Sequence, residues 1–205
     1  MENRKAIGII GGGPGGLTLA RILTMRGIAA TVFELDEHPL SRPQGGTLDL
    51  HTDSGILALR QAGLEAEFLA HARYEDQESR IYDKGGALRF SDVGGIDRDR
   101  PEIDRTQLRA ILIDSLPQTT IAWGQKIRAV AALDDGRHRI MGEQGSLGDF
   151  DLVVGGDGAW SVVRPLVSAA RPVYSGVTFV ELGIDDVDRR HPAIAGFVGH
   201  GKASV

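Results

Sequence analysis

Three glycines near the amino terminus constrain the fold most. Gly11, Gly13 and Gly16 form the pattern G-x-G-x-x-G directly after the run KAIGII at residues 5–10. That run is short, apolar and rich in isoleucine, which predicts a buried strand ending in a tight turn. A helix over 17–26 and a second buried strand over 30–34 are predicted to follow. The opening is therefore expected to be a β-α-β unit of a parallel sheet.

In this position the glycine pattern is typical of a dinucleotide-binding loop. The first glycine allows the turn, the second lets the backbone approach a pyrophosphate, and the third lets helix and strand pack closely. Free N–H groups and the helix dipole favour an anion at the start of the helix. The candidate cofactor-binding residues of this loop are Gly11, Gly13, Pro14, Gly15 and Gly16. A glycine-rich turn that binds nothing is the alternative interpretation.

Glu34 ends the second predicted strand, where a carboxylate accepts hydrogen bonds from the hydroxyls of an adenosine ribose. An acid there disfavours a 2′-phosphate, so NADP is not the expected ligand of the loop. The glycine pattern and Glu34 alone do not distinguish an NAD site from an FAD site.

The rest of the chain contains further predicted helices and strands. Helices are predicted over 54–62, 64–72 and 105–116, the last with Asp104 and Gln107 as a weak capping box. Strands are predicted over 78–90 with a KGG hairpin, over 119–123, 126–133 and 137–142 as a meander, over 151–155, and over 172–184 as a long strand. This order predicts an α/β fold, namely a Rossmann-like domain with a β-meander and the beginning of a second, β-sheet domain.

Composition excludes several function classes. The net charge is −5 with no basic stripe, so a nucleic-acid partner is not expected. No apolar run approaches the roughly 20 residues of a membrane span, and the start lacks a secretory signal, so no membrane partner and a cytoplasmic location are expected. The chain has no cysteine, and its 6 histidines show no metal-ligand spacing. Any reaction at this protein must therefore use a cofactor or side chains other than cysteine and metal-bound histidine.

Four segments carry a resemblance to a known family. They are VFE at 32–34, RPQGGTLDLH at 42–51, PEIDRTQLRAIL at 101–112 and DLVVGGDGAWSVVRP at 151–165. Together they resemble the class A FAD-dependent aromatic monooxygenases, and within them the tetracycline-inactivating enzymes. The resemblance implies FAD as cofactor, NADPH as transient co-substrate and a small-molecule substrate. It also implies that NADPH reduces FAD and that a flavin C4a-hydroperoxide then hydroxylates an aromatic or tetracycline-like ring.

The resemblance also assigns cofactor-side residues. Arg105 matches an arginine that reaches FAD, and Asp157 and Gly158 match an internal DG motif. The segment GTLDLH at 46–51 matches a loop that passes the flavin, which makes Arg42 and Asp49 cofactor-side candidates. Each has a simpler interpretation. Arg105 could be a solvated surface residue, Asp157 a turn and capping residue, and Asp49 an exposed strand residue.

The resemblance implies a large first domain and a short beginning of a second domain. Residues 1–171 are expected to form the FAD-binding domain, with an excursion at about 73–100 toward the substrate side. Residues 172–205 are expected to start a substrate-binding sheet, with Glu181 and Lys202 as substrate-side candidates. Family members are about twice as long, so a truncated chain with an unpaired sheet edge and possible self-association is expected. A non-catalytic FAD-binding fragment and a related FAD- or NAD-dependent reductase are the alternatives.

Overall fold

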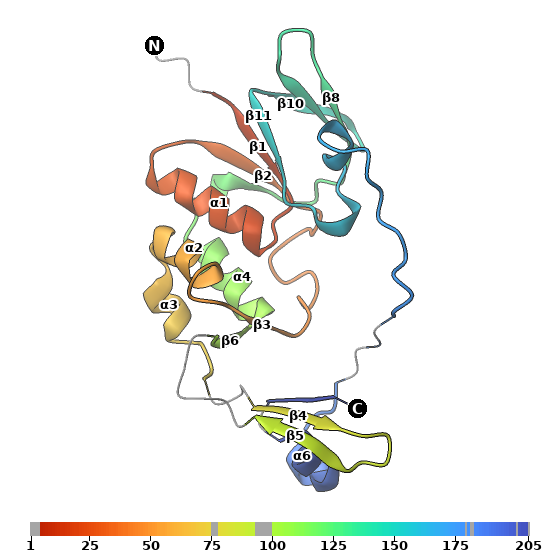
Figure 1. The fold of residues 1–205 in the computed structure, drawn as a ribbon. Coiled ribbons are helices and arrows are strands. Elements are labelled where there is room, and N and C mark those ends of the chain that lie inside the picture. Colours follow the sequence, from red (N-terminus) through yellow and green to blue (C-terminus); the bar gives the residue numbers. More distant parts are fainter. Residues whose placement is uncertain are drawn as a thin grey trace.

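The computed structural model describes residues 5–74, 78–92, 100–178, 180, 183–199 and 201–204 (Figure 1). The helices are α1 (Pro14–Met25), α2 (Gly55–Gln61), α3 (Glu65–Leu69), α4 (Arg105–Asp114), α5 (Val187–Arg190) and α6 (Pro192–Val198). The strands are β1 (Ile7–Ile10), β2 (Ala30–Phe33), β3 (Thr47–Asp49), β4 (Glu78–Tyr82), β5 (Leu88–Asp92), β6 (Glu102–Asp104), β7 (Ile121–Ala122), β8 (Ile127–Ala132), β9 (His138–Gly142), β10 (Gly145–Phe150), β11 (Leu152–Gly155) and β12 (Gly201–Ser204). Short 3-10 helices lie at Gln118–Thr120, Gly158–Trp160 and Arg164–Leu166.

A parallel sheet organises the larger part of the molecule. Its strand order is β11-β1-β2-β7, and each neighbouring pair is parallel. The carboxyl ends of its strands therefore lie at one edge of the sheet, where open α/β sheets bind their ligands. The β-α-β opening predicted from the sequence is present.

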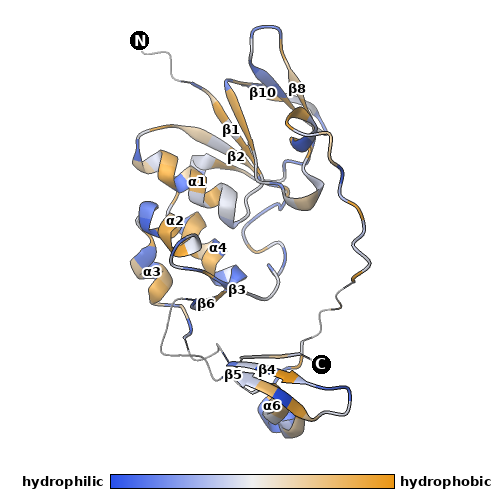
Figure 2. Ribbon diagram, viewed as in Figure 1, coloured by the Kyte–Doolittle hydropathy of each residue, from blue (hydrophilic) through white to orange (hydrophobic). Residues whose placement is uncertain are grey.

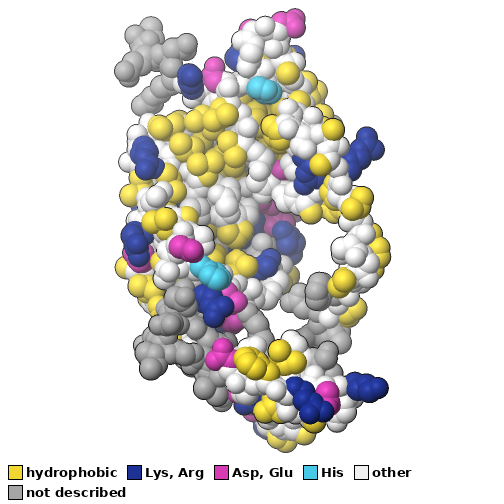
Figure 3. Space-filling model, in the orientation of Figure 1, with side chains coloured by type: hydrophobic (Ala, Val, Ile, Leu, Met, Phe, Trp, Pro, Cys, Tyr) yellow, Lys and Arg dark blue, Asp and Glu magenta, His cyan; other side chains and the backbone are white. Residues whose placement is uncertain are grey.

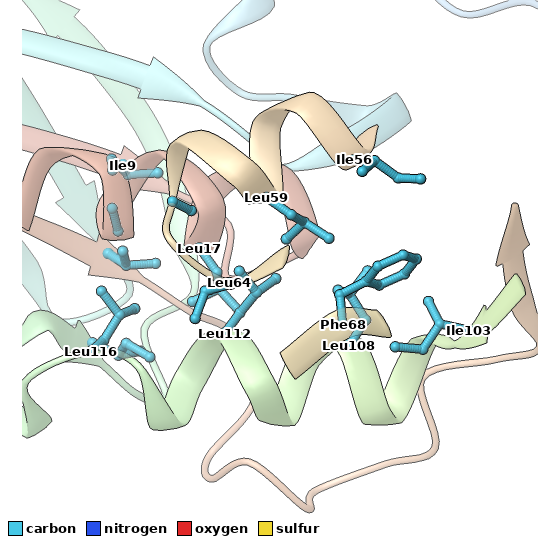
Figure 4. Close-up of a cluster of buried hydrophobic side chains, with 14 residues drawn as sticks. Ile9, Leu17, Ile56, Leu59, Leu64, Phe68, Ile103, Leu108, Leu112 and Leu116 are labelled. Carbon is cyan, nitrogen blue, oxygen red and sulfur yellow. The ribbon is translucent and has the colours of Figure 1, made fainter. Parts of the chain in front are cut away.

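Helices cover one face of this sheet. β1 and β2 are mostly hydrophobic along their length (Figure 2), and alternate residues point to opposite faces. Ile9 and Val32 are fully buried against α1, α2, α3 and α4. Figure 4 shows this cluster, in which the Phe68 ring of α3 lies beside Leu108 and Ile103.

The meander covers the other face. Ile10 and Phe33 pack against Val130, Ile140 and Phe150 from the antiparallel sheet β10-β9-β8. Phe33 and Phe150 meet edge to face, with ring centroids 5.6 Å apart. Helices, parallel sheet and meander thus form three layers, which we call the glycine-loop domain (residues 5–74 and 100–166).

A second, smaller sheet lies apart from these layers (Figure 1). Strand β4 pairs with β5 through a hairpin and, in parallel, with β12 from the far end of the chain. The Tyr82 ring stacks on Phe197 of α6 at 3.9 Å, and the Tyr82 hydroxyl donates to the Phe197 carbonyl. We call β4, β5, α5, α6 and β12 the small sheet unit (residues 78–92 and 187–204). Hydrophobic side chains are exposed on it and along the segment that leads to it (Figure 3).

Three local predictions were wrong. The described residues of 172–184 form no strand, and the stretch around Ile194 and Phe197 is helix α6 rather than a strand. Asp104 makes no capping hydrogen bond to α4, because its carboxylate pairs with Arg73 at 3.0 Å instead. Strand β10 was not predicted, because Gly145 and Gly148 weaken its pattern.

Candidate functional site

A cavity of about 660 Å³ opens at the carboxyl edge of the parallel sheet. This volume lies within the usual range of small-molecule and cofactor sites. The cavity is lined by the ends of β1 and β2, the turn after β11 and the start of the meander. Its lining includes six predicted cofactor-binding residues, namely Gly11, Gly13, Glu34, Arg42, Asp157 and Gly158.

A second hollow of about 550 Å³ lies at the opposite edge, beside Ile7, Ala30 and Thr120. It contains none of the predicted residues. The cavity at the carboxyl edge is therefore the candidate site.

The glycine loop has the geometry that its pattern predicts. Gly11 has φ +103°, and a Cβ there would lie 2.5 Å from the Gly156 carbonyl oxygen. A Cβ on Gly16 would lie 2.1 Å from the Gly11 carbonyl oxygen, so the third glycine lets α1 pack against the loop. Nothing lies within 4 Å of the Cβ position of Gly13, which lines the cavity. The loop is closed on the protein side and open on the cavity side.

Helix α1 begins beside this opening. Gly13 is its N-cap and provides no side-chain hydrogen bond, and Pro14 occupies the first turn. The first N–H groups of a helix have no partner within the helix, and with the dipole they favour an anion. Pro14 and Gly15 are exposed in this turn, whereas Gly16 is buried.

Glu34 is buried and held by backbone groups. Its Oε2 accepts from the Gly12 N–H at 2.5 Å, and its Oε1 accepts from the Asp36 N–H at 2.9 Å. A carboxylate oxygen accepts more than one hydrogen bond, so Glu34 retains acceptor capacity toward the cavity that it lines. The glycine loop and the acid at the end of β2 are thus directly linked.

Asp157 shapes the turn that follows β11. Its Oδ2 accepts from the Val162 N–H at 2.8 Å, and this bond closes the turn. Its Oδ1 is buried and has no hydrogen-bond partner among the described residues. A buried acceptor without a partner is uncommon and calls for a donor. Gly158 has φ +79° and begins the short helix beyond. The turn interpretation and a binding role for Asp157 are compatible.

Arg42 lies at the rim of the cavity. It is 60% exposed and pairs with the buried Asp36 at 2.9 Å. Burial acts to raise the pKa of Asp36, but the hydrogen bond and charge of Arg42 and the charge of Arg109 outweigh it, so the pKa lies below its ordinary value. Asp36 is therefore held as a carboxylate.

Asp49 and Arg105 lie outside this cavity. Asp49 is exposed at the end of β3, and Arg105 is exposed at the start of α4. Their segments adjoin, because β3 pairs with β6 and the Arg105 N–H donates to the Gly46 carbonyl at 3.1 Å. Of the two substrate-side candidates, Glu181 lies outside the described residues. Lys202 lies in β12 opposite Ser79.

Sequence reasoning missed several residues at the site. Lys126, Arg128 and Trp160 line the cavity, and the first two pair with Glu143. Arg109, 3% exposed, lies behind it and pairs with Asp36 at 3.0 Å. A signal for Arg109 was present, because this arginine lies on the apolar side of α4 between Leu108 and Leu112 and so needs a buried partner.

A glycine loop at the carboxyl edge of a parallel sheet, a buried acid after the second strand and a cavity between them define a dinucleotide-binding α/β domain. The model of the FAD binding domain family matches residues 4–200. The chain belongs to this family.

Individual relatives agree with this assignment. The monooxygenase penA of Penicillium thymicola is 35% identical over 212 residues, which cover 97% of this chain and 48% of the relative. The monooxygenase asqM of Emericella nidulans is 33% identical over 97% of this chain and 48% of its own length. The crystal structure of tetracycline destructase Tet(55) superposes with a TM-score of 0.65 at 26% identity, covering 82% of this chain and 42% of that one.

These findings confirm the predicted α/β FAD-binding fold, the resemblance to FAD-dependent monooxygenases and FAD as the cofactor. The chain spans about half the length of the curated relatives it matches. In the part of the chain that the structure describes, no helix is long and apolar enough to cross a bilayer.

Proposed function

We propose that this chain is the FAD-holding part of an NADPH-dependent flavin monooxygenase. One observation carries the proposal. The start of α1, the carboxylate of Glu34 and the turn at Asp157 and Gly158 meet around one cavity at the carboxyl edge of the sheet.

The residues present fit FAD. The open Cβ position of Gly13 leaves room for a pyrophosphate at the start of α1. Glu34 would accept from ribose hydroxyls, and the unpartnered Oδ1 of Asp157 would accept from a further hydroxyl. Arg42 would lie at the rim beside them, and Asp49 and Arg105 are proposed to hold the flavin end.

FAD, when bound, would supply the redox chemistry of an NADPH-dependent monooxygenation. The chain supplies orientation. The glycine loop and Glu34 would hold the nucleotide end, and Asp49 of β3 and Arg105 of α4 would hold the flavin end. Exclusion of water from the flavin would be the task of segments that close over this end.

The substrate side is proposed to begin at the small sheet unit. The excursion at about 73–100 and residues 172–205 would belong to it, and residues 1–171 otherwise to the FAD-binding domain. Glu181 and Lys202 are proposed as substrate-side residues. A small aromatic or tetracycline-like substrate is proposed because the chain is similar in fold to tetracycline destructase Tet(55).

Self-association through the small sheet is also proposed. Strands β5 and β12 are its edges, and Ile81, Leu88 and Phe90 are about half exposed. Light scattering across a concentration series tests it. A constant monomer mass would contradict it. With a net charge of −5, no nucleic-acid partner is proposed.

The function is tested with the purified chain, incubated with FAD and freed of excess by gel filtration. NADPH oxidation and incorporation of ¹⁸O from labelled oxygen are then followed with phenols and tetracyclines. Retained flavin with both signals supports the monooxygenase. Retained flavin without NADPH oxidation identifies a FAD-binding module without turnover, and NADPH oxidation without oxygen incorporation identifies a reductase.

A further inference from the structure

Arg109 is the most buried charged side chain beside the cofactor cavity. Its guanidinium lies 3.0 Å from Asp36 Oδ2 and 3.7 Å from Glu34 Oε1. It also donates to the Gly12 and Pro39 carbonyls, each at 3.3 Å. The side chain therefore connects α4 to the glycine loop, to the acid after β2 and to the loop beyond it.

The planar guanidinium group of an arginine suits this position. Two buried carboxylates, Glu34 and Asp36, lie within 4 Å of the same guanidinium. Two nearby buried carboxylates disfavour each other's charge unless a cation compensates them. A guanidinium reaches several acceptors in one plane, which an ammonium does not. The guanidinium also lies over the Trp123 ring, 5.5 Å from its centroid.

Arg109 does not line the cavity, whereas Glu34 does. Any influence of Arg109 on a bound nucleotide must therefore pass through its partners, namely Glu34, the Gly12 carbonyl and Asp36, which pairs with the cavity-lining Arg42. On the other side, Glu34 is fixed by the Gly12 and Asp36 N–H groups. Together these contacts hold the carboxylate of this cavity-lining residue from both of its oxygens.

We propose that Arg109 is a positioning residue that sets the Glu34 carboxylate for recognition of the ribose hydroxyls of the adenosine half of FAD. The proposal rests on the proposed function, because it presumes that FAD occupies this cavity. It adds a specific consequence. Without Arg109 the chain should lose its ability to distinguish a ribose from a sugar that lacks hydroxyls.

The experiment measures the affinities of ADP and 2′,3′-dideoxy-ADP by displacement of FAD. The wild-type chain is expected to prefer ADP by about tenfold or more, the usual size of hydrogen bonds to a carboxylate. In Arg109→Met this preference is expected to fall to about twofold or less, with ADP weakened and dideoxy-ADP nearly unchanged. In Glu34→Gln it should fall similarly, and combining both substitutions should add little further loss.

Arg21 provides the matched control. It is a partly buried arginine on α1 that donates to the Ala62 and Ser115 carbonyls and does not line the cavity. Arg21→Met should lower thermal stability and leave the preference for ADP intact. A merely structural Arg109 would behave in the same way.

The outcomes separate this inference from the proposed function. A wild-type chain that binds neither FAD nor ADP rejects the proposed function and this inference with it. A wild-type chain that prefers ADP, with a folded Arg109→Met that keeps the preference, rejects this inference alone. If Arg109→Met does not fold, Arg109→Lys takes its place. Lysine keeps the positive charge but lacks the planar guanidinium. A reduced preference for ADP in this variant supports the positioning role, and an unchanged preference overturns the proposal.

Discussion

The glycine-loop domain and the small sheet unit use similar residues with different results. Phe68 of the larger domain is fully buried between helices, whereas Phe90 of the small sheet is 53% exposed. Ile9 in β1 is also fully buried, and Ile81 in β4 is 45% exposed. The parallel sheet is covered on both faces, whereas among the described residues the small sheet is contacted by the short helix α6. The glycine-loop domain therefore has its own core, while the small sheet leaves apolar surface for other contacts.

The charged residues of the two regions also differ in burial. Near the cofactor cavity, Glu34, Asp36 and Arg109 are buried and join segments far apart in the chain. In the small sheet, Arg80 pairs at 2.6 Å with Glu78, only two residues away. Arg80 also donates to the Gly196 carbonyl of α6 at 2.8 Å, and both members of the pair are more exposed than the cluster beside the cavity. The buried cluster, in contrast, specifies the shape of a site.

Truncating one phenylalanine in each region should give the largest difference. Phe68→Ala removes a fully buried ring and is expected to lower the free energy of unfolding by about 3–5 kcal/mol. Phe90→Ala removes a half-exposed ring and should cost about 1 kcal/mol or less. Urea unfolding followed by circular dichroism measures both. Equal losses would show that the small sheet has a core as complete as that of the larger domain.

Adding one valine in each region should separate binding from folding. Gly13→Val places a side chain in the cavity where nothing else lies within 4 Å of the Cβ, so FAD affinity should fall by about 100-fold or more while the fold persists. Gly196→Val in α6 also meets nothing within 4 Å and is the control, with no expected effect on FAD. Fluorescence titration with FAD gives both affinities. Unchanged affinity in a folded Gly13→Val would move the cofactor away from this loop.

Removing the ribose-side carboxylate should have an intermediate effect. Glu34→Ala is expected to weaken FAD binding by about 1–3 kcal/mol through lost charge-assisted hydrogen bonds. Glu67→Ala, at an exposed position of α3, is the matched control and should bind FAD normally. The same titration measures both. If the two variants bind FAD equally well, Glu34 has only a structural role.

The smallest effect concerns acid pH. The pKa of Asp36 is lowered in the folded state, so its contribution to stability is present above the unfolded pKa and is lost as the pH falls through the folded value. The difference in unfolding free energy between the wild-type chain and Asp36→Asn should therefore be constant near neutrality and shrink below about pH 4. Urea unfolding at several pH values measures it. A difference independent of pH would mean that Asp36 is not held by its two arginines.

Prediction from the sequence was strongest where one local pattern specifies both backbone and chemistry. The glycine spacing, the strand before it and the position of Glu34 predicted the sheet and the edge that holds the cavity. The described residues of 172–184 were wrongly predicted to form a strand. Val177 and Val180 are exposed there, and an apolar run suits a strand only where a neighbouring strand is available.

Long-range contacts could not be predicted, because they depend on residues outside any local pattern. The pairing of β4 with β12 joins segments more than a hundred residues apart, and no local pattern encodes it. The role of Arg109 depends on two carboxylates from another part of the chain. The binding roles assigned to individual residues stay predictions, including those of Asp49, Arg105, Glu181 and Lys202.

The central claim is that the glycine-loop domain holds FAD with its own residues. Its most direct test is the visible absorption spectrum of the purified chain after incubation with FAD and gel filtration. The account predicts a retained flavin spectrum near one equivalent for the wild-type chain, and its loss in Gly13→Val. A wild-type chain that elutes folded and colourless would contradict the claim.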